Sequence, residues 1–347
     1  MKKLLTFVSA ITAGAIGTAA ADVSVAGSGT FYYSSASGDT AIAEQEDTMM
    51  VSGGTVAFSM STETTNGITI TSGASITRDT DDIVEYTAGK TAGGDQGIVG
   101  GMKNLTLGMD GMTVTLGQVD NVGSGTGEGG DVATFASTHA GVKSGSSASS
   151  ANDSAMDGIA DGTGINVSTS MGAASVDLTY VATKGSGANS LLDNATTTGR
   201  ASGMAINVGF DMAGASVNVA TGGNQANAAG AKNDSATAVE VTYAASDALS
   251  VTVGGSAGTI GGADEDNVFV SGAYTMDADT TLSFGYGKGD NTTTAGVVDK
   301  ATALTLNVSR SLGGGVSVFA EYASVSVDNA AVGTSGTAMT VGTSVSF

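Results

Sequence analysis

Apolar and polar residues alternate with a period of two along most of this chain, which is the pattern of β-strands whose two faces meet different surroundings. In the last eleven residues, Met339, Val341, Val345 and Phe347 share one face, and only Thr343 interrupts this apolar row. Such a terminal strand suits a closed barrel in a membrane, where the apolar face meets lipid and the aromatic residue lies at the interface. We therefore expect the last strand to close against the first.

The start of the chain carries a matching strand. Over residues 22–33, Val23, Val25, Phe31 and Tyr33 fall on one face, and small or polar residues fall on the other. A first and a last strand of the same design are what barrel closure requires, because a closed barrel leaves no free edge.

The residues before this strand have the three-part layout of a secretory signal peptide. Met1-Lys2-Lys3 is followed by an apolar run from Leu4 to Ile16 and then by Ala19-Ala20-Ala21. The alternative, a membrane anchor, is disfavoured because the run is shorter than the ~20 apolar residues that span a bilayer as a helix. We predict a signal peptide over residues 1–21, cleaved after Ala21, and a single barrel domain over residues 22–347.

Sixteen alternating segments of about ten residues can be counted, which is the length of a tilted membrane-spanning strand. They cover residues 22–33, 51–63, 67–78, 103–109, 112–119, 164–171, 174–183, 204–210, 215–221, 238–245, 248–255, 267–276, 280–288, 301–310, 315–325 and 337–347. With an even number of strands, both chain ends lie on the same side of the membrane. Short turns such as Asn66-Gly67 and Asp110-Gly111 then lie on that side and the long loops on the other, as in outer-membrane barrels.

Composition supports an all-β fold and narrows the function. The chain has 54 Gly and no Cys, Pro or Trp, and only 13% of its residues are charged. Gly and β-branched residues disfavour helices, and no later segment approaches 18 apolar residues in a row, so spanning helices are not expected. The net charge of −21 becomes −23 once Lys2 and Lys3 are removed, with 33 acidic residues against 10 basic ones. Such a field repels nucleic acid and attracts cations.

Three local motifs, taken with the strand count, resemble the general diffusion porins of Gram-negative bacteria in their sixteen-stranded trimeric form. They are Ala21-Asp22-Val23-Ser24-Val25-Ala26-Gly27, Leu116-Gly117-Gln118-Val119-Asp120-Asn121 and Val345-Ser346-Phe347. The resemblance implies a transmembrane antiparallel barrel of about 16 strands in the outer membrane. It also implies passive diffusion of small hydrophilic solutes through a water-filled channel, a homotrimer surrounded by outer-membrane lipids, and recognition of Phe347 by the barrel-insertion machinery.

In that family the loop after the fifth strand folds into the lumen and narrows it, a place held here by residues 120–162. Its candidate pore residues are Asp120, Glu128, Asp131, Asp153, Asp157, Asp161 and Lys143, and those of the lumen wall are Asp177, Glu240, Glu321 and Lys103. Carboxylates in a narrow passage favour cations, so we expect a cation-preferring channel. The chain departs from the family pattern in lacking a visible ladder of arginines, since it has only Arg78, Arg200 and Arg310.

The sequence offers little support for nucleotide binding, catalysis or a metal site. The run Gly125-Thr126-Gly127-Glu128-Gly129-Gly130 matches a dinucleotide fingerprint by letter, but it opens no helix, so we interpret it as a flexible loop. With one histidine, His139, and no cysteine, thiol catalysis and a His-rich zinc site are excluded, and no enzyme is expected. No cofactor is predicted, although Asp264, Glu265 and Asp266 form an acidic cluster, assigned to an external loop, that is a calcium candidate. The alternative function is an exported β-rich surface-layer or adhesin-type structural protein.

Overall fold

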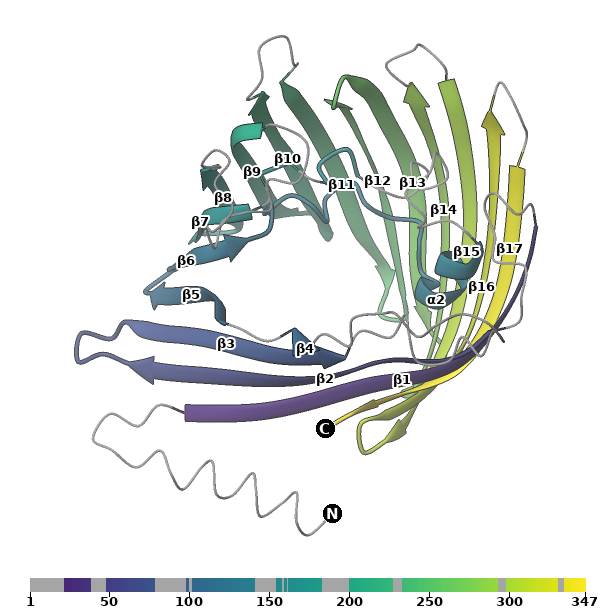
Figure 1. Cartoon of the computed structure of the whole chain (residues 1–347), viewed down its shortest axis with the longest axis horizontal. Coiled ribbons are helices and arrows are strands. Elements are labelled where there is room, and N and C mark those ends of the chain that lie inside the picture. Colours follow the sequence, from purple (N-terminus) through teal and green to yellow (C-terminus); the bar gives the residue numbers. More distant parts are fainter. Residues whose placement is uncertain are drawn as a thin grey trace.

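The computed structural model shows a closed antiparallel β-barrel, and helix α2 (Thr134–Ala140) lies inside it (Figure 1). It describes residues 22–38, 48–78, 98–99, 102–140, 154–157, 159–160, 162–182, 200–226, 233–292, 298–329 and 334–347. The predicted signal peptide, residues 1–21, lies outside this part. Among the described residues, no helix is both long and apolar enough to cross a membrane.

The strands confirm the alternation seen in the sequence, and most extend beyond their predicted bounds. They are β1 (Asp22–Gly38), β2 (Thr48–Glu63), β3 (Thr69–Arg78), β4 (Ile98–Val99), β5 (Met102–Met109), β6 (Met112–Val119), β7 (Gly162–Met171), β8 (Ala174–Ala182), β9 (Arg200–Met212), β10 (Ala215–Ala226), β11 (Asp234–Ser246), β12 (Leu249–Ile260), β13 (Ala263–Thr275), β14 (Thr280–Thr292), β15 (Val298–Gly313), β16 (Val316–Asn329) and β17 (Thr334–Ser346). Helix α2 (Thr134–Ala140) lies between β6 and β7.

The barrel has sixteen positions in its wall. Both β4 and β5 pair with β3, so together they take one position. The last strand closes on the first, as predicted, with β17 antiparallel to β1. Beyond the paired residues, the backbones of Gly27 and Phe347 exchange two hydrogen bonds of 2.8 and 2.9 Å. The terminal residue is therefore part of the wall.

The two faces of the wall differ as the alternation requires. On β15, the outward Leu304, Leu306 and Val308 are 38–41% exposed, whereas the inward Thr305 is fully buried. Lys300 and Arg310 bound the same outward row. Their separation corresponds to about 25 Å along the barrel axis, at roughly 3.3 Å per residue and a tilt of about 40°. This matches the height of the apolar band on membrane barrels.

One predicted loop is wrong. Residues 256–266 were expected to connect two strands, yet they continue both strands, with Ala257 opposite Asp266 and Ile260 opposite Ala263. Only Gly261 and Gly262 form the turn, and both have positive φ angles, 61° and 87°, that favour glycine. Short alternating residues such as Gly258 and Thr259 gave no apolar row to mark the strand, and the acidic cluster 264–266 consequently lies in β13.

Candidate functional site

The interior of the barrel is the candidate site, and a loop enters it. After β6, the chain runs along the inside of the wall and reaches α2, which packs against β16, β17 and β1 (Figure 1). On the way, Val122 donates its backbone N–H to the Thr179 hydroxyl of β8 at 3.0 Å. Thr126 donates to Asn207 of β9 at 3.3 Å, and Asn267 of β13 donates to the carbonyl of Gly127 at 2.9 Å. The loop after the fifth wall position is thus held against the wall over many strands.

Glycine residues allow the backbone of the loop to lie this close to the wall. A Cβ added to Gly129 would lie 2.0 Å from the ring of Phe269, and one added to Gly127 would lie 2.8 Å from the Cβ of Ala238. Gly127 also has a φ angle of 77°. As predicted, residues 125–130 form a loop and open no helix, and Gly127 and Gly129 let its backbone pack directly on inward side chains.

Hydrogen bonds from polar side chains of the wall hold the loop where it enters α2. The Thr305 hydroxyl of β15 accepts the N–H of Val132 at 3.0 Å and donates to the carbonyl of Gly130. On β16, Glu321 accepts the backbone N–H groups of Phe135 and Ala136 at 2.8 and 3.0 Å. A buried carboxylate needs such donors, and the first turn of a helix has N–H groups without intrahelical partners.

Asp131 acts just before α2. Its Oδ1 accepts the N–H of Ala133 at 3.0 Å and the Ser137 hydroxyl at 2.5 Å. This carboxylate therefore stabilises the start of the helix. Asp131 lies on the loop, as predicted, and has a structural role there.

Apolar contacts complete the docking of α2. The inward rows of β15, β16 and β17 carry alanine and valine here. A buried cluster joins them to the helix, and its members are Ala133, Ala136, Ala140, Ala301, Ala303, Ala323, Val325, Val327 and Ala338. The ring of Phe135 lies between Tyr32 and Phe319, with centroid distances of 4.5 and 5.2 Å.

The returning limb of the loop docks on a second stretch of wall. Met156 and Ile159 are fully buried among inward alanines of β9, β10 and β11. The N–H of Ala155 donates to the Ser256 hydroxyl at 2.7 Å, and that of Ala160 donates to Asn224 at 2.9 Å. Both described limbs of the loop are therefore fixed to the wall.

The wall of β2, β3, β5 and β6 carries small and hydroxyl side chains on its inward rows. The pairing places Thr71 opposite Ser61 and Thr106, and Thr106 opposite Thr115. The hydroxyls of Thr106 and Thr115 are 3.1 Å apart. This stretch of the lumen is neutral wherever its side chains are described, except for Glu63 near the β2–β3 turn.

The described basic residues are confined to the outward face, whereas acidic residues lie on both faces. Where side chains are described, the basic residues Lys288, Lys300 and Arg310 all lie on outward rows. The acidic residues on inward rows of the strands are Asp22, Glu63, Asp177, Asp211, Asp234, Glu240, Glu265, Asp299 and Glu321. The described lumen wall therefore carries negative charge only.

The predicted site residues occupy different settings. Asp120, Glu128 and Asp157 of the loop are exposed, Asp177 and Glu240 are partly buried, and Glu321 is buried under the loop. Lys143, Asp153 and Asp161 lie outside the described residues, as do the side chains of Lys103 and His139.

Asp234 and Asp299, which face inward and are buried, were not among the predicted lumen residues. The predicted strands began at residues 238 and 301, a few positions too late. Extending the alternation toward the N-terminus, by four residues from residue 238 and by two from residue 301, would have placed both carboxylates on the inward face.

The calcium candidate does not converge on one point. Neighbouring residues of a strand point to opposite faces, so Glu265 faces inward while Asp264 and Asp266 face outward. Among the described residues, no group of three or more His, Cys, Asp or Glu is placed to hold a metal ion. The calcium site stays a prediction.

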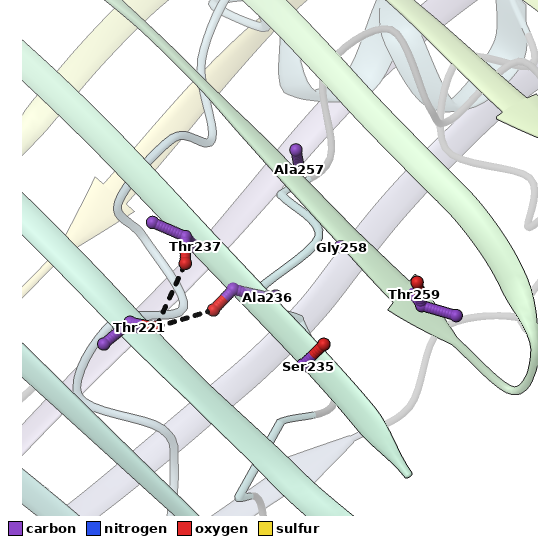
Figure 2. A pocket seen from close by; sticks show the side chains of 7 residues that line it. All are labelled: Thr221, Ser235, Ala236, Thr237, Ala257, Gly258 and Thr259. Atoms are coloured by element: carbon purple, nitrogen blue, oxygen red, sulfur yellow. Dashed lines mark hydrogen bonds between the residues drawn. The ribbon is translucent and has the colours of Figure 1, made fainter. Parts of the chain in front are cut away.

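Hydroxyl groups replace apolar side chains near the long-loop end of the outward face. A shallow hollow of about 320 Å³ lies there over β10, β11 and β12 (Figure 2). Thr221 bonds Thr237 across it at 3.0 Å, while Val219 and Val239 follow one outward position further along. The hollow therefore marks the edge of the apolar band.

The chain resembles known proteins over almost its whole length. Residues 6–330 match the family model described as Gram-negative porin. Among solved structures, OmpF of Salmonella typhi in complex with daunomycin has a TM-score of 0.68 at 12% identity, covering 94% of this chain and 97% of that one. The trimer form of OmpT, an outer-membrane protein of Vibrio cholerae, has a TM-score of 0.64 at 14% identity, covering 94% and 99%. The anion-selective porin of Comamonas acidovorans has a TM-score of 0.64 at 13% identity, covering 94% and 100%. No curated protein sequence matches the chain.

Proposed function

The chain belongs to the Gram-negative porins, which form channels for passive diffusion through the outer membrane, and we propose that its channel prefers cations over anions. The observation that carries this proposal is the division of charge, with carboxylates on the inward rows and the described basic residues on the outward rows. Because the chain belongs to a family of channels, the alternative hypothesis of an adhesin or surface-layer protein is set aside.

The fold alone does not set the sign of selectivity. The anion-selective porin of Comamonas acidovorans has a similar fold at 13% identity. Selectivity therefore has to come from the charges that line the passage. Glu128 on the loop and Glu240 on β11 repel each other electrostatically, and neighbouring carboxylates raise the local concentration of cations.

Zero-current potential under a salt gradient tests this proposal. Detergent-extracted protein would be inserted into a planar bilayer between two KCl concentrations, and the potential should take the sign of a K⁺-preferring channel. Neutralising three lumen carboxylates together, as Asp120→Asn, Glu128→Gln and Glu240→Gln, should lower the ratio of K⁺ to Cl⁻ permeability. Asp131 is best left unchanged, because it shapes the start of α2.

A matched control changes the same number of charges outside the lumen. Asp266 and Asp328 lie on outward rows and Asp277 lies in a turn. Changing these three to Asn should leave the permeability ratio unchanged. An anion-preferring native channel, or a ratio insensitive to the lumen triple, would refute the proposal.

We further propose that the chain assembles as a homotrimer and that Phe347 serves the barrel-insertion machinery. Small outward residues on β3, Ser72 and Ala74, suit close packing between barrels. Chemical cross-linking in mild detergent should give a ladder ending at three chains. A ladder ending at one or two would contradict the trimer.

A further inference from the structure

Methionines occupy the short-turn rim on the outward face of the barrel. Met109, Met171 and Met212 end the strands β5, β7 and β9, and Met276 directly follows β13. All four precede a short turn, and they are 36%, 62%, 62% and 57% exposed. We call these four residues the thioether rim.

The strand register places the thioether rim on the outward face. Met109 is opposite Met112, which is opposite the outward Thr169. Met212 is opposite Ala215, which is opposite Tyr243, an exposed aromatic of the same face. Met276 continues the outward row of Tyr274. The rim is therefore a band of sulfur atoms on the outside of the barrel.

Charged residues beside the rim place it at the water boundary. Met109 precedes Asp110, and Met276 precedes Asp277, each of which lies in the turn that follows. Asp277 lies 3.5 Å from Arg310, the residue that ends the apolar row of β15 on this side. Because charges stay near water, the thioethers beside them lie at the edge of the lipid.

Other methionines provide internal comparisons. Met339 and Met204 are 64% and 56% exposed on the outward face, but they lie within strands. Met339 is opposite Tyr322, which is opposite Leu306 in the apolar row of β15. Met204 continues the outward apolar row of Ile206 and Val208 on β9, so lipid should cover both. Met156 is fully buried by the protein under the inward loop.

We propose that the thioether rim is a modification site, at which peroxides of the surrounding water convert methionine to methionine sulfoxide. The sulfur lone pair attacks the outer peroxide oxygen, a sulfur–oxygen bond forms and the oxygen–oxygen bond breaks. The sulfur is oxidised by two electrons, the peroxide is reduced by two, and the leaving oxygen takes the proton. The sulfoxide is polar, and sulfoxide reductases reduce it back to methionine. The site can therefore be modified and restored without a change in the lumen.

Peptide-resolved mass spectrometry of the full barrel in lipid nanodiscs tests this. The probe is peroxymonosulfate, whose charge keeps it out of the hydrocarbon and which leaves as hydrogen sulfate after giving up one oxygen. Met171, Met212 and Met276 should gain oxygen severalfold faster than Met204 and Met339, with Met156 slowest. In denatured protein these differences should vanish. Equal rates for Met339 and the rim in nanodiscs would overturn the proposal.

A leucine variant separates the rim from other sources of oxidation. The triple change Met171→Leu, Met212→Leu and Met276→Leu keeps side chains of similar size and should lose most of the fast oxygen uptake. The matched change Met204→Leu and Met339→Leu should keep it. Conductance should be the same before and after rim oxidation, because the rim faces away from the lumen. A fast phase that survives in the triple variant, or a conductance that changes with it, would overturn the proposal.

Discussion

The carboxylate of Glu321, on wall strand β16, accepts a hydrogen bond of 2.8 Å from the backbone N–H of Phe135 in the inward helix α2. The same oxygen accepts the N–H of Ala136, and the other oxygen accepts an amide N–H from Asn307 at 3.1 Å. Glu321 is only 6% exposed. A charge placed among inward alanines and valines is thus satisfied by the loop, and the loop is positioned by the wall.

Replacing Glu321 with Ala should therefore loosen the inward loop. The N–H groups of Phe135 and Ala136 would lose their acceptor, at a cost of about 1–3 kcal/mol for each buried group. We expect noisier and larger single-channel currents and faster protease cleavage in the loop. Glu321→Gln, which keeps one acceptor oxygen, should show a smaller change. Currents and cleavage identical to the native protein in both variants would contradict this role.

Gly129 offers a steric test of the same docking. A Cβ there would overlap the Phe269 ring, whereas one on Gly125 would meet nothing within 4 Å. Gly129→Ala should destabilise the docked loop by about 1–3 kcal/mol, as overpacking does, and Gly125→Ala should not. Protease cleavage of the loop in detergent measures both. Adding Phe269→Ala to Gly129→Ala should restore resistance, and failure of this rescue would place the cause elsewhere.

Sequence alternation was enough to predict the barrel. On β15 the row of Leu304, Leu306 and Val308 predicts both the strand and its outward face, because lipid tolerates only apolar side chains there. Sixteen strands and the closure of β17 on β1 follow from the count and from the matching ends. Where outward residues are short or polar, as Ala257 and Thr259 are in β12, the pattern fades and the strand end was misplaced.

The interior was harder to predict, because local patterns do not tell which inward residues a loop will cover. Val325 and Val327 sit on the lumen face, and their apolar character has a reason only once α2 is placed against them. The same holds for Gly129, whose lack of a side chain matters because Phe269 lies beneath it. Contacts between residues more than a hundred positions apart decide these roles.

The turn between β13 and β14 should respond to acid. Hydrogen bonds from the backbone N–H of Asp279 and from Thr280, with a smaller contribution from Arg310, lower the pKa of Asp277 below its ordinary value of 3.8. A lowered pKa in the folded state means that this stabilisation is present above about pH 4 and is lost as the pH falls through the folded-state pKa. Between pH 4 and pH 2, the thermal unfolding midpoint should fall less in Asp277→Asn than in the native barrel. Parallel declines would contradict the assignment, while Asp247→Asn, in another turn, serves as the control.

A positive charge on the neutral wall should reduce the cation preference. Ser75 of β3 faces inward opposite Ala57, in the part of the lumen where no basic side chain is described. A unit charge about 8 Å from a passing ion contributes about 0.5 kcal/mol in water and about 2 kcal/mol at an effective dielectric constant of 20. Because it attracts Cl⁻ and repels K⁺, Ser75→Arg should lower the permeability ratio by at least about fivefold at low salt, where screening is weak. Ser75→Gln controls for the added bulk and should reduce conductance without moving the zero-current potential. If arginine and glutamine have the same effect, the ions pass too far from this wall to sense its charge, and the passage lies against the loop instead.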